Sequence, residues 1–257
     1  MSRGLFRTVA LLATCGSILC LTGGAGAAFA APTPGMLATT LVNKTGTTIT
    51  VVAGVGRGNT ITVWQTGASI RIRDTGDTVA PSGDCTAISA TEVACPAADT
   101  TELVVNAGDQ ADNVTSSLAN LGVTLIGGPG DDNLYGGSAN DTLQGDEGSD
   151  FLSGGAGNDT LTGGAETDRI FGGGGNDSIE GRGGADIING NAGNDVIDGG
   201  SGNEQIVAGA GNDYADGGSG RDTIDAVDNV SGNDYVEGGS QMDDCRADLG
   251  DNVSGCP

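Results

Sequence analysis

Aliphatic residues recur at every ninth position through the second half of the chain. From Gly127 the sequence divides into eleven nine-residue units without a gap, and two further units follow residues 226–228. The eighth residues of the thirteen units, aliphatic in nearly all, are Leu134, Leu143, Leu152, Leu161, Ile170, Ile179, Ile188, Ile197, Ile206, Ala215, Ile224, Val236 and Cys245. A disordered chain has no reason to keep this spacing, so the period predicts a repeating folded structure.

Each unit predicts one tight turn followed by one short strand. In residues 154–162, GGAGNDTLT, the glycines and Asn158 tolerate left-handed backbone angles, so the first six positions can turn. The last three residues alternate faces, which points Leu161 inward and Thr160 and Thr162 outward. Two units then make one coil with a strand on each side. The predicted fold is an all-β parallel solenoid with an aliphatic interior.

The sixth position of every unit is acidic. These residues are Asp132, Asp141, Asp150, Asp159, Asp168, Asp177, Asp186, Asp195, Glu204, Asp213, Asp222, Asp234 and Asp243. Stacked carboxylates repel one another, and one buried aliphatic side chain per unit is little to set against the ordering of nine residues. The pattern therefore predicts that a cation is needed to hold the coils together.

The repeat G-G-x-G-x-D-x-U-x resembles the RTX (hemolysin-type) calcium-binding nonapeptide, which is a known repeat signature. The resemblance implies a parallel β-roll that binds several calcium ions between the turns of successive coils. The ligands would be the thirteen acidic side chains and turn carbonyls, an oxygen set that suits Ca²⁺. It also implies that acids two units apart, such as Asp159 and Asp177, share ions.

Some units depart from the repeat. Glu204 replaces Asp, Glu166 and Gln241 replace the fourth-position glycine, and residues 226–228 interrupt the register, so weaker binding is expected there. Gram-negative RTX proteins often carry a protease, lipase or toxin domain and an uncleaved C-terminal export signal. This sequence shows neither feature, and the resemblance covers about half of it, so it implies calcium binding alone.

Charge and composition narrow the function further. The chain has 34 Asp and Glu against 10 Lys and Arg, a net charge of −24, which disfavours nucleic acid as a partner. Histidine is absent from the sequence, which excludes Ser-His-Asp catalysis and HExxH zinc sites. Forty-nine glycines and 3% aromatic residues argue against a conventional globular core.

The N-terminus predicts export. Residues 1–30 read as a signal peptide, with Arg3 and Arg7, an apolar run over 9–21 and small residues ending at Ala30. Cys15 and Cys20 raise a lipoprotein alternative, which the preceding Thr14 and Leu19 disfavour. We therefore expect a secreted, extracellular protein without a transmembrane segment after cleavage, beginning with a linker over residues 31–38.

Residues 39–106 predict a small β-rich region. Stretches 47–52, 59–64 and 69–74 alternate polar and apolar residues with period two, and 101–106 resembles another strand. The sequence leaves open whether these strands pack onto the array or form a separate sandwich. The array itself is predicted over 107–246, because residues 107–115 form a degenerate unit with Asp112 and Val114 at its sixth and eighth positions.

Four cysteines remain after the signal peptide, an even number for an exported chain. Local pairing is favoured because both loops are short: Cys85 with Cys95, and Cys245 with Cys256. The second pair would close a C-terminal tail over residues 247–257.

The leading functional hypothesis is a secreted calcium-binding protein without catalysis. One alternative is a calcium-gated cell-surface or matrix interaction module of unknown partner, with Trp64 marking a contact patch. A carboxylate-dependent hydrolase is less favoured, because the acids of the β-rich region have no evident base or nucleophile beside them. These acids are Asp74, Asp77, Asp84, Glu92, Asp99 and Glu102.

Overall fold

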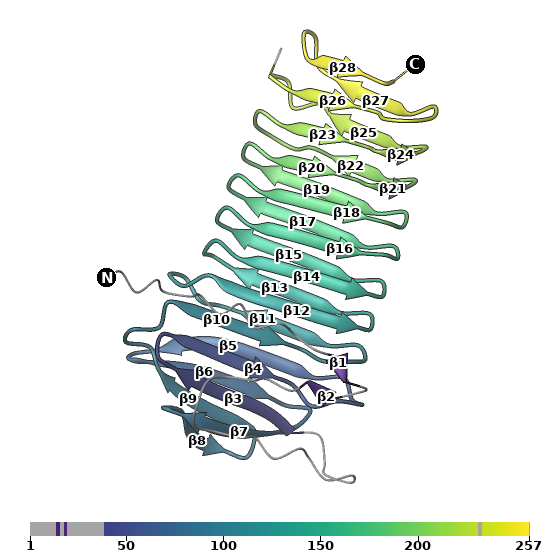
Figure 1. Cartoon of the computed structure of the whole chain (residues 1–257). Coiled ribbons are helices and arrows are strands. Elements are labelled where there is room, and N and C mark those ends of the chain that lie inside the picture. Colours follow the sequence, from purple (N-terminus) through teal and green to yellow (C-terminus); the bar gives the residue numbers. More distant parts are fainter. Residues whose placement is uncertain (1–13, 16–17, 20–38, 231–232, 257) are drawn as a thin grey trace, which may run out of the picture. The chain divides into compact units, whose positions relative to one another are not determined.

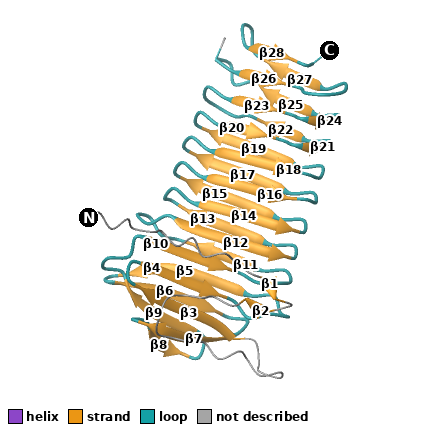
Figure 2. Cartoon of the chain, in the orientation of Figure 1, coloured by secondary structure: helices purple, strands orange, loops and turns teal. Residues whose placement is uncertain are grey.

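The computed structural model describes residues 14–15, 18–19, 39–230 and 233–256. These residues form strands, turns and loops and no helix, so none of them belongs to a helix that could span a membrane (Figure 2). The chain divides into two compact units, residues 1–37 and 38–257. In the first, β1 (Thr14–Cys15) and β2 (Ile18–Leu19) pair antiparallel. The rest of the predicted signal peptide and linker lies outside the described residues.

Two sheets of twelve strands make up the second unit (Figure 1). Sheet 1 contains, in spatial order, β7 (Thr78–Gly83), β3 (Thr39–Thr45), β4 (Thr48–Val52), β10 (Glu102–Asn106), β12 (Val123–Pro129), β14 (Thr142–Glu147), β16 (Thr160–Gly164), β18 (Ser178–Arg182), β20 (Val196–Asp198), β23 (Tyr214–Asp216), β26 (Tyr235–Glu237) and β28 (Asn252–Ser254).

Sheet 2 contains, in the same direction, β8 (Thr86–Ser89), β9 (Glu92–Pro96), β6 (Ser69–Asp74), β5 (Thr60–Thr66), β11 (Asn113–Ser116), β13 (Asn133–Gly137), β15 (Phe151–Ala156), β17 (Arg169–Gly174), β19 (Ile187–Ala192), β22 (Gln205–Val207), β25 (Thr223–Ala226) and β27 (Asp244–Ala247). A further pair, β21 (Ser201–Gly202) and β24 (Ser219–Gly220), joins two adjacent turns.

From β10 onward the chain alternates between the two sheets, and every strand pair is parallel. Within the repeats the register advances by one coil of two units, so that Leu143 pairs with Leu161 in sheet 1 and Leu134 with Leu152 in sheet 2. The parallel solenoid predicted from the nine-residue period is confirmed.

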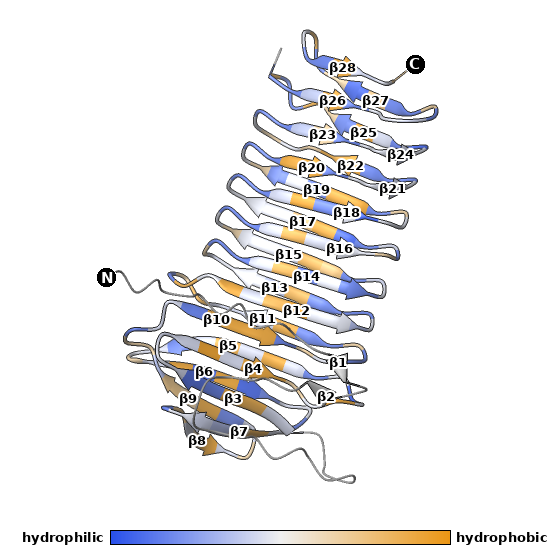
Figure 3. Cartoon of the chain, viewed as in Figure 1, coloured by the Kyte–Doolittle hydropathy of each residue, from blue (hydrophilic) through white to orange (hydrophobic). Residues whose placement is uncertain are grey.

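The eighth-position side chains fill the interior between the sheets. All are buried except Cys245, which is partly buried at the C-terminal end. Each repeat strand carries one such buried residue, and its neighbours are polar in strands such as β14 and β16, which Figure 3 shows as apolar bands across the sheets. Because the side chains of a strand alternate between its faces, the polar seventh and ninth residues point outward.

The strands of residues 39–106 lie in the same two sheets as the repeats. β4 pairs in parallel with β10, and β5 pairs in parallel with β11, while β3, β6, β8 and β9 add antiparallel pairs beyond them. We call residues 39–106 the cap. Its strands β4, β5, β6 and β10 each bury two aliphatic side chains, whereas a repeat strand buries one.

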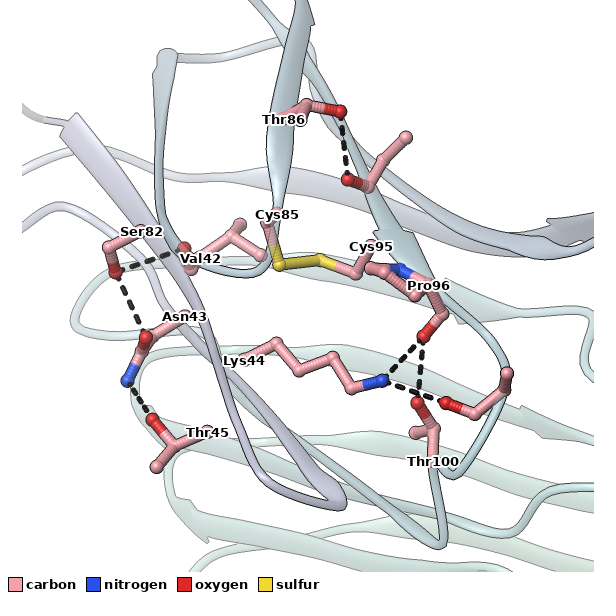
Figure 4. The surroundings of a disulfide bond; sticks show 12 residues. Val42, Asn43, Lys44, Thr45, Ser82, Cys85, Thr86, Cys95, Pro96 and Thr100 are labelled. Atoms are coloured by element: carbon pink, nitrogen blue, oxygen red, sulfur yellow. Dashed lines mark hydrogen bonds between the residues drawn. A yellow bond between two sulfur atoms is a disulfide. The ribbon is translucent and has the colours of Figure 1, made fainter.

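Both predicted cysteine pairs are disulfide-bonded in the structure. Cys85–Cys95 lies beside the buried Lys44, whose Nζ donates hydrogen bonds to the carbonyls of Pro96 (2.8 Å) and Ala98 (3.0 Å) (Figure 4). This amine ties the segment after β9 to β3. Cys245–Cys256 joins β27 to the segment that follows β28.

Candidate calcium sites

The sixth-position acids lie inside the solenoid. All thirteen are buried, with at most 4% of any residue exposed. Each one directly precedes a strand, so alternate units place their acids in two rows. Row 1 precedes the strands of sheet 1 and consists of Asp141, Asp159, Asp177, Asp195, Asp213 and Asp234. Row 2 precedes those of sheet 2 and consists of Asp132, Asp150, Asp168, Asp186, Glu204, Asp222 and Asp243, preceded by the buried Asp112 of the degenerate unit.

Within each row, the backbone N–H of one acid donates to the carboxylate of the acid in the next coil, with a break between Asp186 and Glu204. The backbone N–H of Asp159 donates to Oδ1 of Asp177 at 2.8 Å, and the N–H of Asp141 donates to Oδ1 of Asp159 at 2.7 Å. The same bond is repeated along row 1 up to Asp234. Acids two units apart are therefore direct neighbours, which is the juxtaposition that ion sharing requires.

The second carboxylate oxygen has no partner. Oδ2 of every sixth-position Asp is buried and accepts no hydrogen bond from any described residue. It faces the first-position glycine of its own unit and the first-position carbonyl of the next coil. A Cβ on Gly136 would lie 2.5 Å from Asp141 Oδ2 and 2.7 Å from the Gly154 carbonyl. A carboxylate oxygen and a carbonyl oxygen thus lie around one point. Both are acceptors, so they cannot form a hydrogen bond with each other, and the environment fits a cation.

Burial raises the pKa of carboxyl groups in both rows, such as Asp159 and Asp168, although the backbone hydrogen bond to Oδ1 opposes the change. The pKa rises to about 7 for Asp112, Asp132, Asp159, Asp168 and Asp195, and to about 6 for Asp141, Asp150, Asp186 and Asp234. At neutral pH the buried rows therefore need a counter-charge or a proton, and a divalent cation supplies the former.

Turn carbonyls can complete the coordination. Gly155 has φ +107°, and a Cβ there would collide with the carbonyl oxygen of Gly137 in the preceding coil. Glycine at this position permits the close stacking of these two turns without strain. Among the described residues no three acidic or cysteine side chains converge on one point. The residues present therefore fit ions held by one carboxylate from each of two coils together with carbonyls, and a bound calcium would neutralise the paired carboxylates.

A parallel β-solenoid with glycine turns and internal carboxylate rows defines the class of a β-roll. The comparison with protein families agrees: residues 126–161, 162–197 and 198–227 match the RTX calcium-binding nonapeptide repeat (4 copies). Over these residues the chain carries RTX calcium-binding nonapeptide repeats, folded as a β-roll. No curated protein matches the sequence.

Sequence reasoning missed a second ladder, on the outside of the turns that lead into sheet 1. The fifth-position Asn158 accepts a hydrogen bond at Oδ1 from the N–H of Asn176 (2.8 Å), and Asn140, Asn176 and Asn194 make the same bond to the next coil. The opposite turns carry mixed residues at this position, such as Ser149. The unbroken Asn at every second unit was the available signal.

Glu204 interrupts row 2. Neither of its carboxylate oxygens accepts a hydrogen bond from a residue that the structure describes, although its own N–H donates to Asp222 Oδ1 at 3.0 Å. Burial, together with Asp222, raises the pKa of Glu204 to about 8. The additional methylene of Glu204 moves the carboxylate away from the N–H of Asp186. An Asp at this position would accept a hydrogen bond from that N–H, as the other acids of the row do.

We expect Glu204→Asp to lower the calcium concentration at the midpoint of folding. The shorter side chain would restore the bond from Asp186, a gain of about 1 kcal/mol for a buried hydrogen bond. The reverse change, Asp186→Glu, should raise the midpoint and serves as the matched control. A higher midpoint for Glu204→Asp would show that the longer side chain makes a required contact.

Three second-position residues are strained because they occupy a glycine conformation. Asp146, Arg182 and Asn191 have φ of +77°, +75° and +72°. Arg182→Gly should raise Tm by about 2–4 °C, since left-handed angles cost a side chain about 1–2 kcal/mol. Its ion pair with Glu180 (3.5 Å) is exposed, so little is lost with it. The control Arg221→Gly, at an ordinary φ, should leave Tm unchanged or lower it in the same thermal melt.

Two of the acids considered for a hydrolase, Asp74 and Glu92, are engaged in hydrogen bonds or ion pairs of the cap. Asp74 accepts hydrogen bonds from Thr40 Oγ1, Thr60 N and Gly76 N. Glu92 is paired with Arg71 (2.9 Å) and Arg73 (2.7 Å). Arg73 in turn lies over the ring of Trp64, with 5.1 Å between Cζ and the ring centroid. The Trp64 indole thus contacts Arg73 within the cap.

Proposed function

We propose that this chain is an exported β-roll protein whose repeat array folds as it binds calcium, and that it has no catalytic activity. The observation that carries the proposal is the pair of internal rows in which each carboxylate keeps one unpartnered oxygen. Calcium bound there would remove the repulsion within each row and bridge successive turns.

Folding and binding are coupled because the array has little else to hold it. A repeat strand buries one aliphatic side chain, worth about 2 kcal/mol. The carboxylates beside it lie close together only in the folded state, so calcium has strong sites only there. The binding free energy then becomes folding free energy.

Export is supported by the two disulfides, which persist in oxidising compartments. The absence of catalysis is supported by the engagement of the cap carboxylates Asp74 and Glu92 in hydrogen bonds and ion pairs. The role that remains is structural: a rigid roll that forms on entering a calcium-rich environment.

The test is circular dichroism of residues 31–257 during a calcium titration, starting from metal-free protein. We expect β-sheet signal to rise cooperatively at millimolar calcium or below. Magnesium at the same concentration should be much less effective, because it prefers octahedral sites and retains its water. An array spectrum that is the same with and without calcium would refute the proposal.

A second candidate is an interaction module, favoured by an aromatic row on the outer face of sheet 2. The ring centroids of Tyr135 and Phe151 are 5.4 Å apart, and those of Phe151 and Phe171 are 5.5 Å apart. Calcium would assemble this row, because the three residues come from successive coils. Capture of a cell-surface or matrix component in calcium but not in chelator, lost in Phe151→Ser, would support it.

A further inference from the structure

The cap contains a nonapeptide of its own. Residues 54–62 read GVGRGNTIT, with Asn59 at the sixth position and the fully buried Ile61 at the eighth. β5 pairs with β11 so that Ile61 lies opposite Val114, and Asn59 stacks next to Asp112. The N–H of Asn59 donates to Asp112 Oδ1 at 2.5 Å, the same ladder bond that joins the acids of row 2. Asn59 therefore starts row 2, with an amide in place of a carboxylate.

The amide nitrogen of Asn59 occupies the position at which a sixth-position Asp of the array has its unpartnered Oδ2. Nδ2 donates to the carbonyl of Ala107 at 2.9 Å, and Ala107 is the first residue of the next coil. In the array the equivalent atoms are Asp132 Oδ2 and the Gly145 carbonyl, which lie together around Gly127 as two acceptors. At the first coil a hydrogen bond thus joins groups that elsewhere need a cation between them.

The same nitrogen contacts further oxygens of the two coils. Nδ2 lies 3.3 Å from the carbonyl of Gly54, 3.2 Å from that of Arg57 and 3.2 Å from Asp112 Oδ1. A flipped amide would direct its oxygen at these acceptors, so the carbonyls fix its orientation. Oδ1 is buried without a partner among the described residues, because the strand beyond β5 is the antiparallel β6, which supplies no ladder N–H.

We propose that the Asn59 amide replaces calcium at the first coil, so that the cap folds without the ion and offers a preformed edge to the array. The cap also has the apolar content to do so, since β4, β5, β6 and β10 each bury two aliphatic side chains. The inference rests on the proposed function, because a calcium-independent cap matters only if the array needs calcium. Calcium-driven folding would then proceed from β10 and β11 toward the C-terminus.

The cap has its own optical reporter. Trp64 is the single tryptophan of the chain and lies on β5, five residues after Asn59. We would follow its emission, together with hydrogen exchange of β4 and β5, in metal-free residues 31–257 of the natural sequence and of Asn59→Asp. Asn158→Asp is the control, since it adds the same charge where only the side-chain oxygen is used.

In chelator, the natural sequence and Asn158→Asp should show native-like Trp64 emission and slow exchange in β4 and β5, while the array exchanges fast. Asn59→Asp should lose that protection in chelator, because a buried carboxylate would face the Ala107 carbonyl and Asp112. Calcium should restore it, because the first coil would then have the ligand set of the others.

Two results would overturn the proposal. One is Trp64 emission of the natural protein in chelator that equals its emission in denaturant. The other is Asn59→Asp that stays as protected as the control. Neither result would contradict the proposed function, because that is tested by the far-ultraviolet signal that the array gains with calcium. As a second variant, Asp132→Asn would place an amide against the Gly145 carbonyl, and should slow exchange of β13 in chelator relative to Asp132→Ala; equal rates would also overturn the proposal.

Discussion

Asp177→Ala is expected to raise the calcium midpoint of folding far more than Asp243→Ala, although both delete one buried carboxylate. Asp177 lies mid-row: its Oδ1 accepts from Asp159, and its N–H donates to Asp195. Asp243 ends row 2. Asp222 is its neighbour on one side, and no further coil follows on the other, because the strand after Asp243, β27, is the last strand of sheet 2. Ions shared between coils are therefore lost on both sides of Asp177 and on one side of Asp243.

We expect a midpoint shift of about tenfold or more for Asp177→Ala, equivalent to about 1.4 kcal/mol, and of about two- to threefold for Asp243→Ala. Nearest-neighbour coupling predicts the same order, since a broken central coil leaves two short stacks. Asp198→Ala, which removes an outward-facing acid of β20, is the control and should not raise the midpoint. Equal shifts for Asp177→Ala and Asp243→Ala would mean independent sites and no shared ions.

Acidification should partly replace calcium. Burial raises the pKa of Asp141 to about 6 and that of Asp159 to about 7, whereas Asp in an unfolded chain titrates at about 3.9. The metal-free fold therefore binds protons that the unfolded chain releases. The stability that this proton uptake contributes to the metal-free fold is fully present below about pH 4 and is lost as the pH rises through about 6–7.

Metal-free protein should accordingly gain β signal on titration from pH 8 to pH 5.5, measured by circular dichroism with hydrogen exchange of β15–β18. In the presence of calcium the direction reverses. Ions displace these protons, so the calcium midpoint should rise as the pH falls. A metal-free array that is equally unfolded at pH 8 and 5.5 would show that proton uptake does not relieve the repulsion within the rows.

Periodicity carried most of the prediction of the fold. The aliphatic eighth position, for example Leu143 and Leu161, determined the strand, its inward face and the advance of two units per coil, because glycine turns leave few other ways to bury one side chain in nine. Local spacing likewise predicted the disulfides of Cys85 and Cys245 with their nearest partners. These features depend on residues that are close along the chain, which is why they can be predicted from the sequence.

The depth of the acids could not be read from the sequence. An Asp beside a glycine turn is usually solvated, and only the stacking of coils buries Asp177 and gives its Oδ1 a donor from Asp159. Glu204 shows the same limit: the sequence marks it as a departure, but its two unpartnered oxygens follow from the fixed distance between coils.

By itself, then, the sequence determined the repeat and its period, since both depend on patterns within nine residues, and its resemblance to the RTX nonapeptide predicted calcium and the acidic residues as ligands. Only the tertiary structure decided that the cap continues the two sheets, because the pairing of β4 with β10 joins segments about fifty residues apart. It alone placed Asn59 next to Asp112, where the Asn59 amide donates to the carbonyl of Ala107, the counterpart of the array carbonyls that would bind calcium. Contacts across that separation depend on how the coils stack, and no local pattern records them.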